Sequence, residues 1–194
     1  MIVYRYPNRR CLVKVSTALF ILIIILTIIL AVLLTRTKTK KSNKEAILRW
    51  NSTGIMVAGV TGQSGNTSDK LSTPRGIGID WSNALYITDA NNHRIQKYSK
   101  DASVGETVVG EGSGIAGVGN GFLSRPYDVA IDLNENVFVV DSNNQRIQLW
   151  TRGSLVGKTI AGTTGVVGNS ANTLNYPYGI AYDSITHGIY ISDY

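Results

Sequence analysis

The sequence predicts an all-β fold, a β-propeller of four-stranded antiparallel blades, preceded by one transmembrane α-helix. A ten-residue segment occurs three times, starting at Leu71, Leu123 and Leu174, so that the copies lie 52 and 51 residues apart. Each copy contains only short runs of strand-forming residues, and strand-only repeats of about 40 to 50 residues are typical of propeller blades. The uncharged stretch 15–34 predicts the helix.

The second copy shows the four strands of one blade most clearly. A short apolar run ends at Asp132, and the polar turn residues that follow predict a chain reversal. An unbroken apolar run comes next, as in a strand buried on both faces, and then an alternating run, as in a half-exposed strand. Pro126 precedes the first strand, where its missing N–H interrupts no ladder. We expect strands at 129–131, 137–140, 146–150 and 158–161.

These motifs resemble the repeats of the NHL family, and the resemblance extends over residues 47–194. The family signature is a first strand that begins Pro-x-Gly, a second strand that ends in Asp, and then Asn-x-Arg-Ile, found here at 92–95 and 144–147. The resemblance implies an NHL-type β-propeller. Asp128 replaces the glycine in the second copy, which suggests that this position tolerates a side chain.

Two acid–base pairs recur at the turn between the second and third strands. They are Asp89 with Arg94 and Asp141 with Arg146. A catalytic pair would be needed only once, whereas a pair in every blade suits a repeated structural task. We therefore expect both pairs to hold their turns.

The predicted strands add up to an incomplete propeller. The chain opens on the two outer strands of one blade, at 47–50 and 54–59, continues through two whole blades, and stops after two inner strands of another. That is three blades' worth, and propellers close with about four to eight blades. We expect a C-terminally truncated member of the family; further blades in cis or an oligomer would be needed to close the ring.

The first 46 residues predict a membrane anchor. A short basic tail, 1–14, precedes the span at 15–34, and a basic linker follows at 35–46. Twenty helical residues reach about 30 Å, the thickness of the hydrocarbon core of a bilayer. A cleaved signal peptide is disfavoured because its apolar region would be about 7 to 15 residues long. Cys11, just before the span, is a candidate for palmitoylation.

The orientation of the anchor is predicted from weaker signals. Basic residues flank the span on both sides, so the positive-inside rule is nearly balanced. Two N-glycosylation sequons, at Asn51 and Asn66, favour an exported domain. We expect a single-pass type II membrane protein with the propeller outside the cytosol.

The charge distribution disfavours nucleic acid as a partner. Residues 1–50 contain ten Lys and Arg and one acid, whereas residues 51–194 contain nine Lys and Arg and twelve acids. The positive net charge of +6 therefore belongs to the flanks of the span, where it faces anionic lipid headgroups. The propeller itself lacks the positive field that a nucleic-acid-binding face requires.

The sequence predicts a non-catalytic binding module for a protein or glycan partner. Loops that enter the blades and loops after the second strands lie on one face, and binding residues usually lie on such loops. Register-equivalent residues that differ between copies are free of the repeat's structural demands. The candidate partner-binding residues are Arg75, Tyr127, Tyr178, His93 and Gln145.

Two other functions stay open on family resemblance. The first is an enzyme resembling the amidating lyase or a lactonase, with its metal ligands in missing blades. The two histidines of this chain, His93 and His187, are too few for a catalytic zinc site, so we predict no metal and no cofactor. The second is a cytosolic propeller that recruits substrates for ubiquitination, although one cysteine cannot build that family's zinc modules.

Overall fold

The computed structural model describes residues 53–194. The predicted tail, transmembrane helix and linker lie outside this range, together with Cys11, Asn51 and the strand predicted at 47–50. In the described part, no helix combines the length and the apolar character that crossing a bilayer requires.

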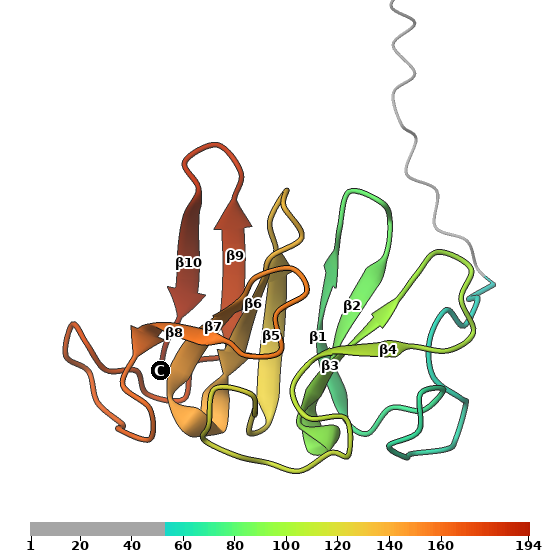
Figure 1. The fold of residues 1–194 in the computed structure, drawn as a ribbon, viewed down its shortest axis with the longest axis horizontal. Coiled ribbons are helices and arrows are strands. Elements are labelled where there is room, and N and C mark those ends of the chain that lie inside the picture. The colour runs from blue at the N-terminus through green and yellow to red at the C-terminus, as the bar shows by residue number, and fades with distance from the viewer. Residues whose placement is uncertain (1–52) are drawn as a thin grey trace, which may run out of the picture. The chain divides into compact units, whose positions relative to one another are not determined.

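The described chain folds into two four-stranded antiparallel sheets and a hairpin, arranged side by side (Figure 1). The first blade contains β1 (Pro74–Ile79), β2 (Leu85–Asp89), β3 (Arg94–Tyr98) and β4 (Glu106–Val109). The second contains β5 (Pro126–Ile131), β6 (Val137–Asp141), β7 (Arg146–Trp150) and β8 (Lys158–Gly162). The hairpin consists of β9 (Gly179–Asp183) and β10 (Gly188–Ser192). Both sheets keep sequence order, which confirms the blade predicted from the repeat.

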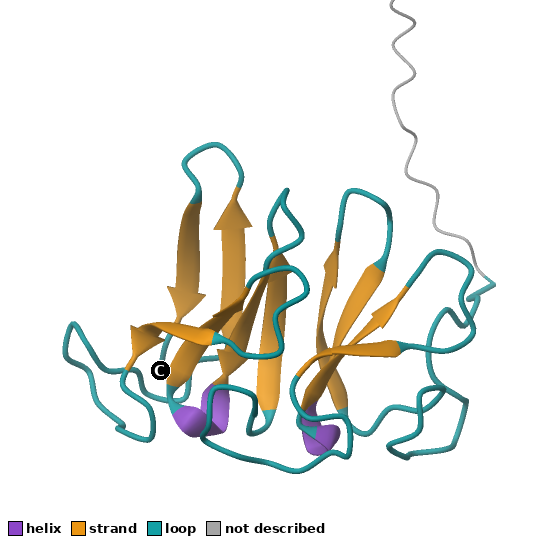
Figure 2. Ribbon diagram, viewed as in Figure 1, coloured by secondary structure: helices purple, strands orange, loops and turns teal. Residues whose placement is uncertain are grey.

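The first strands of the three units lie next to one another. β5 contacts β1 on one side and β9 on the other, so β1, β5 and β9 form the inner row of the array. A short 3-10 helix joins the second and third strands in each blade, η1 (Ala90–Asn92) and η2 (Ser142–Asn144). Figure 2 shows both helices at the same edge as the loops that enter the blades. This edge carries all five candidate partner-binding residues.

The hydrophobic core lies between the two blades. It joins side chains of β2, β3 and β4 to side chains of β5, β6 and β7, and Leu123 from the loop between the blades completes it. Its buried members are Ala84, Tyr86, Ile95, Val109, Leu123, Val129, Val137, Val139 and Trp150. Since each sheet is apolar on both faces, a blade buries its surface only against a neighbouring blade.

An ion-pair network also connects the blades, at the edge away from the 3-10 helices. Lys97 Nζ on β3 lies 3.4 Å from a carboxylate oxygen of Asp80 in its own blade and 3.6 Å from one of Glu135 in the next. Glu135 also pairs with the exposed Arg152. The pair with Arg152 is exposed on the arginine side and contributes about 0 to 1 kcal/mol, whereas the Lys97 pairs are largely shielded from solvent.

One predicted strand is absent. Residues 54–59 were expected to form the outer strand of a first blade, but the structure shows no strand there, and the side chains of Ile55, Met56 and Val57 are exposed. A β-strand depends on pairing with a neighbour, and the partner expected for this segment, 47–50, lies outside the described residues. The described residues therefore contain ten named strands, two blades and a hairpin.

Candidate functional site

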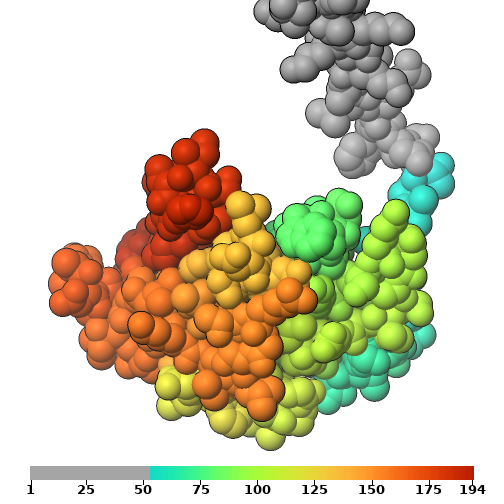
Figure 3. All heavy atoms as spheres, turned by 45° about the horizontal axis from the view of Figure 1, so that its top comes forward, coloured from blue at the N-terminus to red at the C-terminus, as the bar shows by residue number. Residues whose placement is uncertain are grey.

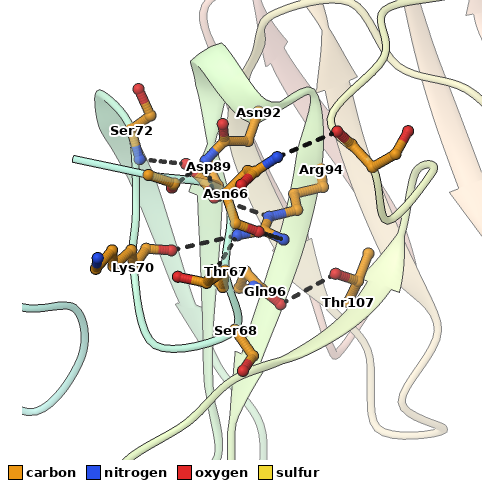
Figure 4. Close-up of polar contacts among 12 residues, drawn as sticks. Asn66, Thr67, Ser68, Lys70, Ser72, Asp89, Asn92, Arg94, Gln96 and Thr107 are labelled. Atoms are coloured by element: carbon orange, nitrogen blue, oxygen red, sulfur yellow. Dashed lines mark hydrogen bonds and ion pairs between the residues drawn. The ribbon is translucent and has the colours of Figure 1, made fainter.

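The blade-entry loop of the first blade is fastened to the sheet by Arg94 (Figure 4). Its guanidinium Nε lies 2.9 Å from Asp89 Oδ2, and both groups are buried. The other guanidinium nitrogens donate to three carbonyl oxygens of the loop, those of Asn66 (2.7 Å), Thr67 (3.0 Å) and Lys70 (3.2 Å). Arg94 thus satisfies loop carbonyls that the sheet does not reach.

The second blade repeats this arrangement. Arg146 Nε pairs with Asp141 Oδ2 at 2.8 Å, and the guanidinium donates to the carbonyls of Val118, Gly119 and Phe122. The structural role predicted for the two pairs is confirmed, but their reach is longer than predicted. They hold the loop 24 to 28 residues earlier in the chain as well as the turn.

The aspartates make a second connection to the same loops, which the sequence analysis missed. The free carboxylate oxygen accepts a backbone N–H, from Ser72 to Asp89 at 2.6 Å and from Ser124 to Asp141 at 2.7 Å. In the hairpin, Asp193 accepts the N–H of Asn175 at 2.7 Å. The signal was present, because an aspartate stands at or directly after the end of the second strand in all three copies. Rigid loop bases hold the neighbouring side chains in place.

The residue before each first-strand proline has an unusual backbone conformation. Thr73, Arg125 and Tyr176 have φ values of 55°, 47° and 48°. The left-handed region is costly for residues other than glycine and persists where surrounding contacts impose it. For Arg125 and Tyr176 the contacts come from the preceding blade: His93 Nδ1 accepts the N–H of Arg125 at 3.0 Å, and Gln145 Oε1 accepts that of Tyr176 at 2.7 Å.

His93 and Gln145, predicted as partner contacts, are therefore links between consecutive blades. Both occupy the left-handed position that ends a 3-10 helix, with φ values of 53° and 57°. Gln145 is only 2% exposed, so its side chain offers no surface to a partner. His93 is partly buried and its ring nitrogen is already bonded. Through these bonds the two residues position the start of the first strand of the next repeat.

The link through His93 predicts a pH dependence of stability. Burial, and next the charge of Arg125, lower the pKa of His93 from its usual 6.5. The unfolded chain therefore binds more protons below pH 6.5, and the contribution of His93 is present above that pH and lost as the pH falls toward the folded-state pKa. We expect His93→Gln, which copies Gln145, to lose less stability on acidification than the parent.

Urea denaturation above and below pH 6.5 measures this effect. The matched control is His187→Gln, because His187 pairs with Tyr182 in the hairpin and not with a neighbouring blade. An acid-induced loss that His93→Gln leaves unchanged would contradict the proposed link.

The other three candidate residues come together in one row. The Arg75 guanidinium lies over the ring of Tyr127, 3.9 Å from its centroid. The Tyr127 and Tyr178 rings meet edge to face with centroids 4.8 Å apart. Each residue belongs to a different repeat, so the row crosses all three inner strands.

Local backbone irregularity helps to orient this row. In both blades the register of the first strand shifts, between Pro74 and Ile77 and between Pro126 and Val129. Bulges of this type re-aim side chains, and Arg75 and Tyr127 stand at the shift. In β5 the carboxylate of Asp128 accepts the N–H of Ile180 at 3.0 Å and so connects β5 to β9. The side chain tolerated at this position thus has a structural role.

Two further exposed residues precede the row tyrosines closely in sequence and were not predicted. Arg125 is exposed, and Tyr176 is 49% exposed; each stands two residues before a tyrosine of the row. The available signal was their equivalence to Thr73 across the repeats. All three residues directly precede the proline found at the same position of each copy, and they differ in type. We define the row surface as Arg75, Arg125, Tyr127, Tyr176 and Tyr178.

The remaining predicted positions lie elsewhere. Asn66 is exposed on the first entry loop, where its side chain donates to the Ser113 carbonyl at 3.5 Å. His187 is bonded to the Tyr182 hydroxyl at 2.8 Å in the hairpin. Among residues 53–194, no three His, Cys, Asp or Glu side chains gather in a way that could hold a metal ion.

A solved structure with a TM-score above 0.5 supports the fold, and two others show a weaker likeness. A structural genomics protein of unknown function from Bacteroides thetaiotaomicron is 22% identical, with a TM-score of 0.54; the match covers 68% of this chain and 35% of that one. A chain of a nidogen/laminin complex is 19% identical over 64% of this chain and 41% of its own, with a TM-score of 0.49. An auxiliary nutrient binding protein from B. thetaiotaomicron is 23% identical over 60% and 34%, with a TM-score of 0.49.

The chain thus spans about a third to two fifths of the length of these structures. No curated protein matches it. The family model for the NHL repeat matches residues 71–98, which run from the end of the first entry loop to the end of β3. The resemblance is supported for this copy: residues 71–98 match the NHL repeat and lie within an array of antiparallel four-stranded blades.

Proposed function

We propose that the array is a recognition module that binds a protein partner through the row surface. The main observation behind this proposal is that Arg75, Tyr127 and Tyr178 contact one another in sequence across three repeats. Tyrosine and arginine are the residue types that contribute most often to binding hot spots in protein interfaces. Both have large contact areas, and here their positions are already ordered before a partner arrives, which lowers the entropic cost of binding.

The charge of the row surface suggests which partner groups it receives. Arg75 and Arg125 form no ion pair with any residue in the range 53–194. Asp128, three residues from Arg125, uses its carboxylate for the N–H groups of Val129 and Ile180. A guanidinium stacked on an aromatic ring keeps its edge N–H groups free for a carboxylate. The expected partner segment therefore combines an acidic residue with an apolar or aromatic one.

Truncation of the row tests this proposal. We expect Tyr127→Ala and Tyr178→Ala each to weaken binding by at least about 1 to 2 kcal/mol, roughly 5- to 30-fold in Kd, because each removes an ordered aromatic contact. Partners enriched on the immobilised protein would be identified, and their affinity for each variant measured by calorimetry.

The matched control is Ile185→Ala, since Ile185 is 87% exposed in the β9–β10 turn, at the other end of the strands from the row. Binding that depends equally on Ile185 would place the site elsewhere. A bound metal together with lyase or hydrolase activity that chelation abolishes would favour the enzyme function instead.

We also propose that residues 15–34 anchor the module in a membrane, with the propeller exported. The sequons at Asn51 and Asn66 motivate this orientation, and Asn66 is exposed, as glycan transfer would require. Expression in a secretory system should yield a mass shift that a glycosidase removes and that Asn51→Gln with Asn66→Gln abolishes. Absence of the shift, with a C-terminal tag protected from external protease, would indicate the opposite orientation.

A further inference from the structure

The ion-pair network between the two blades lines a cavity of about 460 Å³. This volume falls in the range of about 300 to 1,000 Å³ that is typical of small-molecule sites. Figure 3 brings the edge away from the 3-10 helices forward and shows the first blade, in green, meeting the second blade, in orange. None of the residues around the cavity belongs to the row surface. Its lining includes Tyr86, Lys97, Glu135, Val137, Trp150 and Arg152.

The contact between blades does not require a charge at this place. Lys97 lies opposite Tyr86 in the register of β2 and β3, and the equivalent pair in the second blade is Leu149 with Phe138. Phe138 stacks on Tyr182 of the hairpin, so the repeat also makes this contact with leucine in place of the lysine. Burying charged groups is costly, and well-packed apolar residues of similar volume are often at least as stabilising. The charges therefore suit a task of the cavity and not a task of the fold.

Two of the charged groups have unused hydrogen-bonding capacity. The side chain of Glu135 is 13% exposed, and its Oε2 lies 3.6 Å from Lys97 Nζ and 3.5 Å from Arg152 Nε. Both distances exceed the usual range of about 2.7 to 3.2 Å for a hydrogen bond. Among residues 53–194, the Glu135 carboxylate and the Arg152 guanidinium make ion pairs but no hydrogen bond. A shielded carboxylate without a hydrogen-bond donor is uncommon, so the pair offers an acceptor and donors to a ligand.

The mixture of charges favours a neutral ligand. Two acids, Glu106 and Glu135, and two bases, Lys97 and Arg152, line the one cavity, so a ligand with a single charge of either sign meets a like charge. A hydroxyl group both donates and accepts hydrogen bonds. Two adjacent hydroxyls can thus donate to the Glu135 carboxylate and accept from the Arg152 guanidinium while the ion pairs persist. Leu155, which is 87% exposed, adds an apolar wall for C–H groups.

We propose that this cavity binds a sugar residue, with two adjacent hydroxyls on the Glu135–Arg152 pair and the C–H face of the ring against Leu155. The site is additional to the row surface and shares no residue with it. The proposal therefore does not depend on the proposed protein-binding function, and each can fail while the other holds.

Tryptophan fluorescence of the full chain tests the proposed site. Trp150 lines the cavity, and Trp50→Phe with Trp81→Phe leaves it as the single reporter. The protein is kept in a detergent without a sugar headgroup and titrated with glucose, galactose, mannose, fucose and N-acetylglucosamine in turn. We expect a saturable change in emission with at least one of these sugars. Glycine, acetate and methylammonium, which represent zwitterions, anions and cations, should give none.

Two substitutions copy the equivalent residues of the first blade and so preserve the fold. Glu135→Asn copies Asn83, and asparagine suits the left-handed backbone of both positions, with φ values of 62° and 65°. Arg152→Lys copies Lys100 and keeps the charge without the planar fork of donors. We expect each to weaken sugar binding roughly tenfold, the effect of losing one hydrogen bond to a charged group, with unchanged circular dichroism. Lys100→Met is the matched control and should leave the affinity unchanged.

The outcomes that contradict the proposal are equally specific. Emission that responds to none of the sugars, a response to glycine, acetate or methylammonium as large as that to a sugar, or a sugar affinity that Glu135→Asn leaves unchanged would each overturn it. Tyr127→Ala, which alters the row surface, should leave the sugar response intact.

Discussion

Replacing Arg146 with methionine is expected to lower the free energy of unfolding by about 3 to 5 kcal/mol, the range measured when one partner of a buried ion pair is removed. Arg146 is 1% exposed and bonds the Asp141 carboxylate, which is fully buried. Its loss leaves that carboxylate unpaired and removes the donors from three loop carbonyls. Methionine keeps much of the side-chain volume, so the loss reports the polar contacts and not a cavity.

Urea denaturation followed by circular dichroism measures the effect, and Arg152→Met is the matched control. Arg152 also pairs with a carboxylate, that of Glu135 at 3.5 Å, but its side chain is 72% exposed. We expect the control to cost less than about 1 kcal/mol. The double variant Asp141→Leu with Arg146→Met should recover part of the loss, because it leaves no unpaired charge. Equal effects at positions 146 and 152 would show that the buried clamp is dispensable.

The second large effect is expected at Gly76, on the inner strand β1. A Cβ at this position would lie 2.6 Å from the Asp128 Cα and 2.8 Å from the Tyr127 carbonyl oxygen. Both are backbone atoms of β5, so neither can rotate away, and the strands would have to separate. We expect Gly76→Ala to cost about 3 kcal/mol, the upper part of the range for overpacked sites, and also to weaken partner binding because Tyr127 belongs to the row surface.

Gly112→Ala is the control for this substitution, because a Cβ there meets no atom within 4 Å. Its effect should stay within about 0.5 kcal/mol. Denaturation curves with equal slopes for the parent and both variants would show that only stability has changed. A Gly76→Ala protein as stable as the parent would mean that the inner strands can move apart, and the tight β1–β5 contact would then not be required.

The strand pattern was predictable because it is local. Neighbouring residues are enough to recognise the alternation in 146–150, the apolar run in 137–140 and the aspartate near the end of each second strand. The same pattern recurs in each copy, which supports the strand assignment. The segment 54–59 behaves differently from the strands of the two blades. Its sequence is as strand-forming as its equivalent β4, yet it forms no strand in the described structure, since strand formation also depends on a paired neighbour.

The candidate site was only half predictable for the same reason. Register equivalence selected Arg75, Tyr127 and Tyr178, and the structure brings them into contact. The same rule selected His93 and Gln145, which prove to bond the backbone of the following repeat. Sequence register shows which positions are equivalent, but not whether an equivalent position faces solvent or the next blade.

The sequence by itself thus determined the repeat, the four-strand blade and the recurring Asp–Arg pairs, since these depend on residues within one copy. Only the tertiary structure decided the cation–aromatic row and the links through His93 and Gln145. Both depend on the lateral packing of copies about fifty residues apart, where Gly76 and Gly78 allow close approach and bulges re-aim side chains. Contacts between copies arise from the geometry of stacked blades, which the residues of a single repeat do not specify.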